Sequence, residues 1–515
     1  MDFGGICLLA WLKKNKRTVL TVSLVLFGNF MIFLTLWLSR QYEKVYLDQI
    51  LYQLKTSAAG VHRALAGGAV LRVGGYFLLA SLVELLLYKL LSGKAGGRVK
   101  NWSIYAKYCG SRACAFFQRI PLALATLLTL AGIGFFMIRM DVITYAERQV
   151  NESDFIQTHY ADPATTTVTF PEKKRNLVYI FLESMEATYS DTRAGEPIPT
   201  DFIPNLSRLA RENVSFSNTE GPGGALSFAG TTWTASAMVA QTSGVPSKVP
   251  LTADAYGLDA PYMPGLVSIG EILRDQGYAQ TILMGSDADF HGRKPYFQLH
   301  GDYEILDINA LKDQGRLDPD YRIWWGFEDE KLFAYAKEEV TRLAAGDQPF
   351  NFTLLTADTH FPNGLPCNLC QDEHDTQYAN VLSCSDRQVY EFVTWLQAQP
   401  FYENTTIVIC GDHLTMDAHF LEDIDPNYTR TVYNCFINAP VSPIRTKNRQ
   451  FGTFDLFPTT LAALGARIEG DRLALGTDLF SPSQTLAEEY GFETLDEELQ
   501  HGSEYYNTKI LGMEE

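Results

Sequence analysis

Acidic and imidazole side chains follow three apolar stretches of this 515-residue sequence. They are Glu183, Asp358 with His360, and Asp412 with His413, at the ends of "NLVYIFLES" (176–184), "FNFTLLTADTHFP" (350–362) and "NTTIVICGDH" (404–413). A single acidic residue after a strand is usually a turn or capping residue. Three such groups indicate more, because the carboxyl ends of parallel strands meet at one edge of a sheet, where ligands bind. Carboxylates together with imidazole suit a divalent cation such as Zn2+ or Mn2+, so the pattern predicts a metal site.

Hydroxyl groups are concentrated in the uncharged stretch "GTTWTASAMVAQTSG" (230–244). One interpretation is helix capping, since Ser and Thr side chains accept hydrogen bonds from the first free N–H groups of a helix. The other is nucleophilic chemistry, because a divalent cation can activate a Thr hydroxyl that is a weak nucleophile by itself. A helix that begins near residue 234 would also favour a phosphate at its N-terminus.

Alternating strands and helices are expected to position these groups. The apolar runs 176–184, 278–287, 350–362 and 404–413 are predicted strands, and 204–214, 265–277 and 384–399 are predicted helices. Strands that are apolar throughout and separated by helices are typical of a mostly parallel sheet covered on both faces. We therefore expect one large α/β domain in the second half of the chain.

Three long apolar runs lie in the first 145 residues, at 18–39, 69–91 and 120–138. Each is close to the ~20 residues that a helix needs to cross a bilayer, so three transmembrane helices are predicted. The second run carries Arg72, Glu84 and Lys89, and a buried core helix remains an alternative for it. Nothing resembles a cleaved signal peptide, because the runs are too long and lack a cleavage site.

Basic residues predict the orientation of these helices. Lys and Arg gather before residue 18 and again in 89–119, where there is no Asp or Glu. The positive-inside rule places both segments in the cytoplasm and everything after about residue 140 outside. Residues 1–150 hold 18 Lys or Arg against six Asp or Glu, whereas the remaining residues hold 24 against 54. So acidic a domain is a poor nucleic-acid binder, and no nucleic-acid partner is expected.

These features predict five segments. They are a cytoplasmic N-terminus (1–17), a membrane domain of three transmembrane helices (18–140), an irregular polar linker (141–175), an extracytoplasmic catalytic domain (176–480) and a peripheral acidic C-terminal tail (481–515).

Cys367, Cys370 and Cys384 cluster in the polar stretch "PCNLCQDEHDTQYANVLSC". In an oxidising compartment this clustering favours one disulfide, from Cys384 to either of the other two. A zinc site with His374 as fourth ligand is the less favoured alternative. Cys7, Cys109 and Cys114 fall on the inner side or in the membrane and are expected to be reduced.

Four motifs together resemble the membrane phosphoglycerol transferases, a family that includes lipoteichoic acid synthase and the periplasmic-glucan phosphoglycerol transferase. They are "NLVYIFLESMEATYSD", "GTTWTASAMVAQTSGVP", "TADTHFP" and "VICGDHLTM". The resemblance covers about 175–480 in the right order, and the membrane half matches only in general design, with three predicted spans where lipoteichoic acid synthases commonly have five. It implies an alkaline-phosphatase/sulfatase-like domain anchored in a bacterial plasma (inner) membrane as a multi-pass protein.

The resemblance also implies roles for individual residues. Glu183, Thr234, Asp412 and His413 would bind one metal ion, Mn2+ or Zn2+, and Thr234 would carry phosphoglycerol as a covalent intermediate. Thr232 is the alternative nucleophile. His360 and Arg293 would contact the substrate phosphate. The donor would be a phospholipid like phosphatidylglycerol, and the acceptor an envelope glycan or glycolipid.

Other functions remain open at this stage. A phosphoethanolamine transferase would use the same Thr and metal, but such enzymes usually surround the nucleophile with cysteines, and none lies between Cys114 and Cys367. A sulfatase or phosphodiesterase-type hydrolase would share the fold, but sulfatases need a modified Cys or Ser that 230–244 does not offer in the right motif. A non-catalytic membrane-anchored binding domain would be expected to have lost a ligand, and every ligand type is present.

Overall fold

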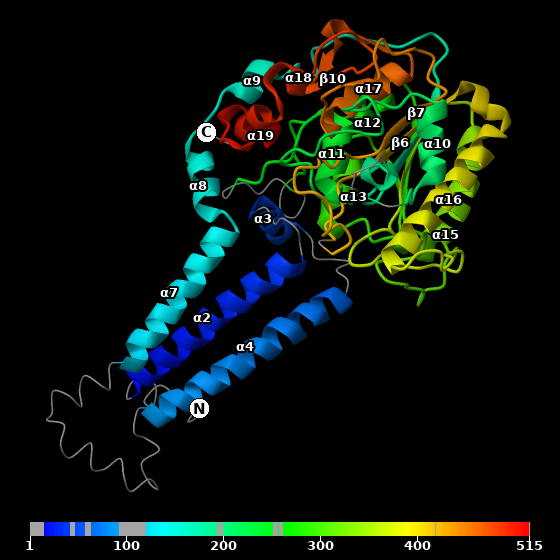
Figure 1. Cartoon of the computed structure of the whole chain (residues 1–515). Helices are drawn as coiled ribbons and strands as arrows, with labels where there is room; N and C mark the ends of the chain where they lie inside the picture. The colour runs from blue at the N-terminus through cyan, green and yellow to red at the C-terminus, as the bar shows by residue number, and fades with distance from the viewer. Residues whose placement is uncertain are drawn as a thin grey trace, which may run out of the picture. The chain divides into compact units, whose positions relative to one another are not determined.

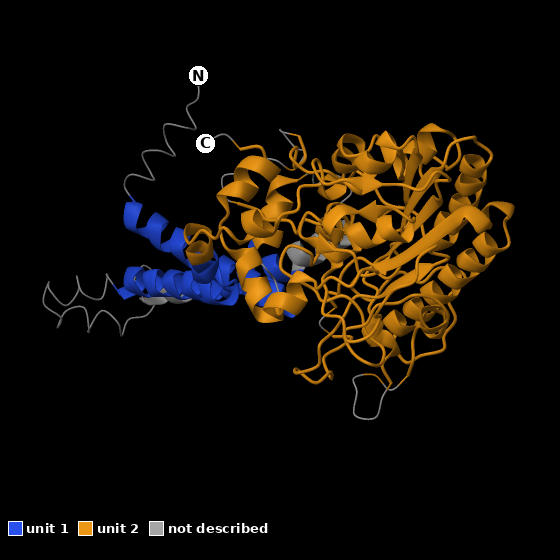
Figure 2. Ribbon diagram, turned by 90° about the horizontal axis from the view of Figure 1, so that it is seen from above, with its two compact units in different colours: residues 1–47, 62–145 blue, residues 48–61, 146–515 orange. Residues whose placement is uncertain are grey.

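The computed structural model of the chain (Figure 1) describes residues 15–41, 47–56, 63–91, 120–192, 198, 200–250, 256, 261–417 and 419–513. The N-terminus before residue 15 and the basic segment 92–119, which carry the predicted orientation, lie outside these residues, as do Cys7, Cys109 and Cys114. The chain divides into two compact units, coloured separately in Figure 2: residues 1–47 with 62–145, and residues 48–61 with 146–515.

The first unit is built from three long helices, α2 (Lys16–Gln41), α4 (Arg63–Leu91) and α7 (Ile120–Arg139), and α2 packs against both of the others. Within the described residues, Lys16–Arg40 and Ile120–Arg139 are long and apolar enough to cross a membrane. α4 coincides with the second predicted span, and its crossing remains a prediction. Two polar side chains of α4, Glu84 and Ser81, accept hydrogen bonds from Asn29 of α2, at 2.7 and 3.1 Å.

The second unit contains a six-stranded sheet in the order β4-β3-β5-β2-β6-β7. The strands are β2 (Asn176–Leu182), β3 (Ala279–Met284), β4 (Glu304–Leu306), β5 (Phe350–Leu355), β6 (Thr405–Gly411) and β7 (Asn434–Ile437). All neighbours are parallel except β6 and β7, which pair antiparallel. The predicted α/β fold with a mostly parallel sheet is therefore confirmed, and the sequence analysis had not identified the edge strands β4 and β7.

Both faces of the sheet are buried, as the unbroken apolar strands predicted. Along β2, Leu177, Tyr179 and Phe181 belong to one hydrophobic core, while Val178, Ile180 and Leu182 belong to the other. This alternation follows from the two-residue period of a strand. The helices that supply the two cores are α11 (Thr234–Ser243), α12 (Ile269–Asp275) and α17 (Leu456–Ala463) on the first, and α10 (Pro204–Glu212), α15 (Asp329–Ala344) and α16 (Gln377–Gln397) on the second.

Shorter elements complete the second unit. They are α3 (Leu47–Lys55, from Asp48 on), α8 (Val142–Val150, from Ala146 on), α9 (Phe155–His159), α13 (Arg293–Leu299), α14 (Ile308–Asp313), α18 (Leu486–Tyr490) and α19 (Phe492–Gln500), with the small strands β1 (Val168–Thr169), β8 (Arg467–Ile468), β9 (Arg472–Leu473) and β10 (Gly476–Thr477). The segment 141–175, expected to be irregular, thus contains helices, and Phe155 and Ile156 from it are buried in the core.

The acidic C-terminal stretch is part of the core, contrary to the expectation that it is peripheral. Leu495 and Leu499 of α19 are buried, as are Tyr506 and Ile510 beyond it. The two leucines are four residues apart and so lie on the same side of the helix, while acidic residues occupy the exposed positions. The overall acidity of the stretch concealed this short apolar stripe.

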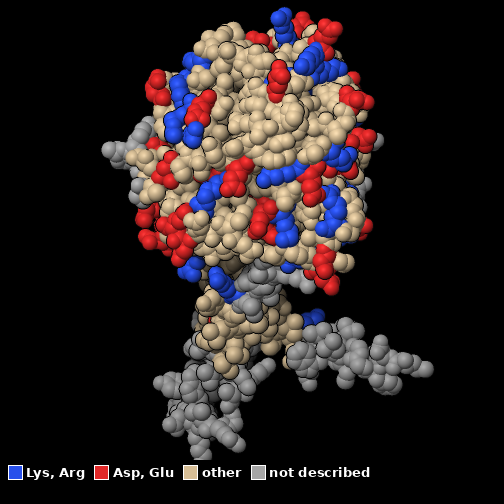
Figure 3. All heavy atoms as spheres, turned by 90° about the vertical axis from the view of Figure 1, so that its right-hand side faces the viewer, with Lys and Arg blue, Asp and Glu red and all other residues tan. Residues whose placement is uncertain are grey.

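Charged side chains of both signs are interspersed on the face of the molecule that Figure 3 shows. The Lys and Arg residues in this view alternate with Asp and Glu over the described surface and do not form a basic patch on this face.

The packing of α19 predicts the effect of shortening one of its buried side chains. Leu495→Ala should lower the free energy of unfolding by about 2–5 kcal/mol, because it removes buried methyl groups and leaves a cavity. Thr494→Ala, at an exposed neighbouring position, is the matched control and should change stability little. Thermal unfolding of the purified variants measures both; equal midpoints would show that this helix does not contribute to the core.

Candidate active site

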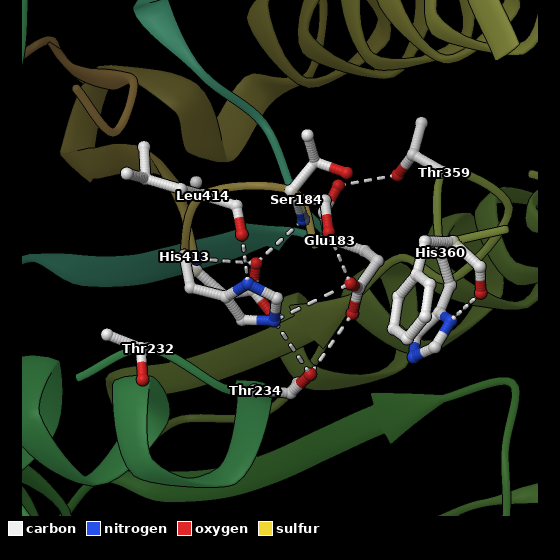
Figure 4. A network of polar contacts seen from close by, with 12 residues as sticks. Glu183, Ser184, Thr232, Thr234, Thr359, His360, His413 and Leu414 are labelled. Atoms are coloured by element: carbon white, nitrogen blue, oxygen red, sulfur yellow. Dashed lines mark hydrogen bonds and ion pairs between the residues drawn. The ribbon is translucent and has the colours of Figure 1, made fainter. Parts of the chain in front are cut away.

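The pairing of parallel strands places the predicted ligands side by side. Leu182 at the end of β2 is in register with Gly411 at the end of β6, so the next residues, Glu183 and Asp412, emerge next to each other. His413 follows immediately, and its Nε2 lies 3.7 Å from Glu183 Oε1 and 3.5 Å from Asp412 Oδ2. All three side chains are buried. Figure 4 shows the group at the carboxyl edge of the sheet.

Thr234 completes this group from a helix on the other side. It is the first residue of α11, and its Oγ1 donates toward Glu183 Oε2 at 3.2 Å and lies 3.3 Å from His413 Nε2. The N-cap position belongs to Trp233, which makes no side-chain capping bond, so Thr234 does not cap the helix. The capping interpretation is therefore wrong for this residue.

The other hydroxyls of 230–244 are directed elsewhere. Thr231 Oγ1 donates to the carbonyl of Phe228 (2.8 Å), and Ser243 Oγ to that of Val239 (2.8 Å). Thr232 Oγ1 accepts a hydrogen bond from Gln49 Nε2 at 2.7 Å. The structure thus brings Thr234 to Glu183 and His413 and turns Thr232, the alternative, toward α3.

The helix that carries Thr234 is fixed to the strand that carries Asp412. Gln241, two turns further along α11, donates from Nε2 to the carbonyls of Gly411 (3.0 Å) and Asp412 (3.1 Å). The turn before the helix needs Gly230, whose φ is +77° and where a Cβ would lie 2.4 Å from the Ser247 carbonyl oxygen. These two constraints hold the start of α11 over the ends of β2 and β6.

Electrostatics of the group favour a cation. Burial raises the pKa of Asp412 to about 7, and the neighbouring charge of Glu183 adds to this effect. Burial also acts to raise the pKa of Glu183, but His360 and His413 outweigh it and the pKa lies below its usual value. Asp412 Oδ2 is buried without a hydrogen-bond partner. Two buried carboxylates with one orphaned oxygen are stable as anions only beside a positive charge.

The donor set fits a first-row divalent metal ion. Within the described residues, Glu183, Asp412 and His413 offer ligand atoms that all lie within 4.8 Å of one another. His413 Nδ1 is 2.7 Å from the Leu414 carbonyl oxygen, which fixes the ring and leaves Nε2 for a metal. Oxygen and imidazole ligands are those of zinc and manganese sites.

His360 faces the group from the loop after β5. It is partly buried, its Nδ1 lies 2.6 Å from the Phe361 carbonyl oxygen, and it acts to lower the pKa of Glu183. Burial lowers the pKa of His360. Its ring packs against Trp325 and Trp324, at centroid distances of 4.9 and 5.8 Å. The sequence analysis missed these two tryptophans, although the pair "WW" at 324–325 is conspicuous in the sequence.

Arg293 lies near the same site but is held by its own loop. Its Nη2 donates to the Asp287 carbonyl (2.7 Å) and its Nε to that of Phe290 (3.1 Å). The side chain is buried, and burial lowers its pKa, while Glu183 is the strongest of the acidic groups that oppose this shift. Asp358, in contrast, turns away from the group, since its Oδ2 accepts from the Asp329 backbone N–H at 3.2 Å.

A segment from far earlier in the chain borders the site, and the sequence analysis did not foresee it. α3 belongs to the second unit from Asp48 onward. Besides the bond from Gln49 to Thr232, the buried Tyr52 donates from its hydroxyl to the His291 carbonyl (2.7 Å) and packs against Trp233 at 5.2 Å between ring centroids. The segment after the first long helix is thereby connected to the start of α11.

Comparison with known proteins identifies related sequences. Residues 175–466 match the sequence model of the sulfatase family. Phosphoglycerol transferase I of Salmonella typhi is 28% identical over 423 residues, which cover 80% of this chain and 51% of the relative. The chain thus spans about half the length of the curated relatives it matches.

One solved membrane protein shares the fold, and a second structure gives a lower score. The integral membrane protein lipooligosaccharide phosphoethanolamine transferase A from Neisseria meningitidis superposes with a TM-score of 0.51 at 14% identity, covering 85% of this chain and 83% of that one. A lipoteichoic acid synthase from Listeria monocytogenes gives a TM-score of 0.49 at 19% identity, covering 64% and 80%.

The geometry predicts how metal binding divides among these side chains. Glu183→Ala, Asp412→Ala and His413→Ala should each lose the metal bound here, because each removes one of three buried ligand atoms. His360→Ala should keep the metal, since its Nδ1 is directed at a backbone carbonyl and its ring packs on Trp325. Metal analysis of the purified variants against the unaltered chain tests this, and loss of metal in His360→Ala would contradict the division.

Proposed function

Because this chain belongs to the sulfatase family, we propose that it is a metal-dependent transferase that moves phosphoglycerol from a membrane phospholipid to an envelope glycan or glycolipid. The observation that carries the proposal is the Thr234 hydroxyl, which is directed at Glu183 and His413 from the start of a helix. A nucleophile in this position suits covalent phosphoryl transfer, and the relatives named phosphoglycerol transferase I support glycerol as the transferred head group.

In the first half-reaction, Thr234 Oγ1 attacks the phosphorus of the donor phosphodiester. The new Thr–O–P bond forms as the bond from phosphorus to the diacylglycerol oxygen breaks, and the proton released by the Thr234 hydroxyl ends on that oxygen, so that neutral diacylglycerol leaves. Glu183 Oε2, 3.2 Å from Thr234 Oγ1, orients the hydroxyl before attack. In the second half-reaction an acceptor hydroxyl attacks the same phosphorus, and Thr234 regains its proton.

Glu183, Asp412, His413 and Thr234 are the residues that would hold the metal ion, Mn2+ or Zn2+. Such an ion supplies Lewis-acid chemistry: it makes a bound hydroxyl more nucleophilic and neutralises phosphate charge. His360 and Arg293 would contact the phosphate oxygens from the opposite side of Glu183. The first N–H groups of α11 add a partial positive charge where the phosphate would lie.

The fold also bears on membrane placement. We propose that the chain is a multi-pass protein of a bacterial inner membrane with its catalytic domain outside. The contacts of α3 with Thr232 and His291 support this, because they require residues 48–55 to lie on the same side of the membrane as the catalytic domain. With α2 as a spanning helix, the N-terminus then lies on the other side.

Reporter fusions test this topology. A reporter placed after residue 56 and one placed after residue 150 should both show extracytoplasmic activity, and one within 92–119 should show cytoplasmic activity. Cytoplasmic activity at residue 150 would contradict the proposed placement of the catalytic domain.

Substitution of Thr234 tests the chemistry. Thr234→Ala should lower turnover by at least about 10³-fold with folding intact, because the nucleophile is lost. Thr234→Ser keeps the oxygen but frees its rotamer and should retain part of the activity. Thr232→Ala is the matched control two residues away. Full activity in Thr234→Ala would refute the proposal.

Mass spectrometry of the peptide with residues 230–244 gives a direct readout. Incubation with phosphatidylglycerol alone should leave a phosphoglycerol ester on Thr234 and release diacylglycerol. An adduct on Thr232 would move the nucleophile by two residues. An adduct with the mass of phosphoethanolamine, formed from the corresponding donor, would favour the phosphoethanolamine transferase instead.

A further inference from the structure

Three cysteine sulfurs converge at a place separate from the candidate active site. Cys367 and Cys370 lie in the loop between β5 and α16, and Cys384 lies in α16. Cys367 Sγ is 3.8 Å from Cys370 Sγ and 3.7 Å from Cys384 Sγ, and all three are free thiols. A disulfide needs about 2.05 Å. The disulfide expected from the sequence is therefore absent from this structure, because both separations are too long for a bond between two sulfurs.

These separations match a tetrahedral metal site. Two thiolates bound to Zn2+ at about 2.3 Å, with a tetrahedral angle between them, lie about 3.8 Å apart. The three sulfurs also form one of the groups, within the described residues, whose ligand atoms all lie within 4.8 Å of each other. Three thiols cannot all be paired in disulfides with one another, whereas one metal ion can bind all three.

N–H groups of neighbouring residues are directed at the sulfurs. The backbone N–H of Cys367 donates to Cys370 Sγ at 3.3 Å. Gln388 Nε2 reaches Cys384 Sγ at 3.5 Å and Cys367 Sγ at 3.7 Å. Each sulfur thus accepts at least one N–H, as metal-bound thiolates do when outer groups orient them.

Two acidic side chains lie near the sulfurs. Asp329 and Asp358, both buried, are close enough for Cys367 to act on them electrostatically, and burial raises the pKa of both carboxyl groups. Three thiolates this close together need positive charge, and a divalent ion provides it.

We propose that Cys367, Cys370 and Cys384 bind one Zn2+ ion through three thiolates, in a second metal site distinct from Glu183, Asp412 and His413. Binding releases the three thiol protons, and a water molecule occupies the fourth position. His374, the fourth ligand considered from the sequence, directs its Nε2 to Ser383 Oγ at 2.9 Å and is not part of the cluster.

The ion would act as a positioning device for the active site. It joins α16 to the end of the loop that carries Thr359 and His360. Thr359 Oγ1 donates to the Glu183 carbonyl at 2.5 Å, so this loop contacts the metal-binding strand end directly. Closing the loop through an ion restricts the positions that His360 can adopt.

Metal substitution distinguishes the two sites. Full-length chain in detergent, kept reduced, depleted of metal and reloaded with Zn2+, should hold two equivalents. Cys384→Ser and Asp412→Ala should each hold one. After reloading with Co2+, the unaltered chain and Asp412→Ala should show thiolate-to-cobalt charge-transfer absorption, and Cys384→Ser should not. Because this absorption requires sulfur ligands, it reports on the cysteine site even if the proposed transferase activity is wrong.

Two controls match the variant. Cys435→Ser changes a buried free cysteine of β7 outside the cluster and should keep the charge-transfer band. His374→Ala should also keep it, and loss of the band there would restore His374 as a ligand and overturn the three-thiolate site.

A measurement on the unaltered chain covers the case in which Cys384→Ser fails to fold. Zn2+ should protect Cys367, Cys370 and Cys384 from alkylation, and a chelator should expose them. A disulfide among the three in protein taken from the native membrane, or alkylation unaffected by Zn2+, would refute the proposal.

Discussion

The parallel pairing of β2 with β6 imposes the constraint on which the site depends. Their register places Glu183 and Asp412 side by side at the edge of a sheet whose two faces are buried, so two carboxylates share a space that water barely reaches. Uncompensated, such charges destabilise the fold by several kcal/mol each. The rest of the site can be understood as compensation: His413, His360 and Arg293 act on the pair, and the proposed divalent cation would complete it.

α11 links this constraint to reactivity. Gln241 holds the helix to the carbonyls of Gly411 and Asp412, the same strand end that supplies the ligands. The helix therefore begins directly over the carboxylates, and its first residue, Thr234, meets them with its hydroxyl. Because Gln241 ties α11 to the strand end that carries Asp412 and His413, and β6 pairs directly with the strand that carries Glu183, the relative positions of ligands and hydroxyl depend little on the longer loops around them.

The loops nevertheless complete the environment. α3, from the N-terminal part of the chain, supports the turn before Thr234 through Gln49 and Tyr52. The loop after β5 brings His360 to the opposite side, with Trp325 behind it. The cysteine cluster lies at the far end of this loop. The proposed zinc ion would hold that end in place, in addition to the hydrogen bonds that Asp358 and Asp329 exchange at its start.

The sequence by itself determined the α/β class, the parallel strands and the candidate ligands Glu183, Asp412 and His413, because unbroken apolar strands must be buried and their carboxyl ends must meet at one edge. Only the tertiary structure distinguished Thr234 from Thr232, since the direction of a hydroxyl depends on the point at which the helix starts. It also decided the place of α3, of Trp324 and Trp325, and of the buried C-terminal leucines, all of which depend on contacts between residues far apart in the chain. The cysteines illustrate the same limit: their spacing allowed a disulfide or a metal site, and the choice between them rests on distances between three sulfurs that no local pattern encodes.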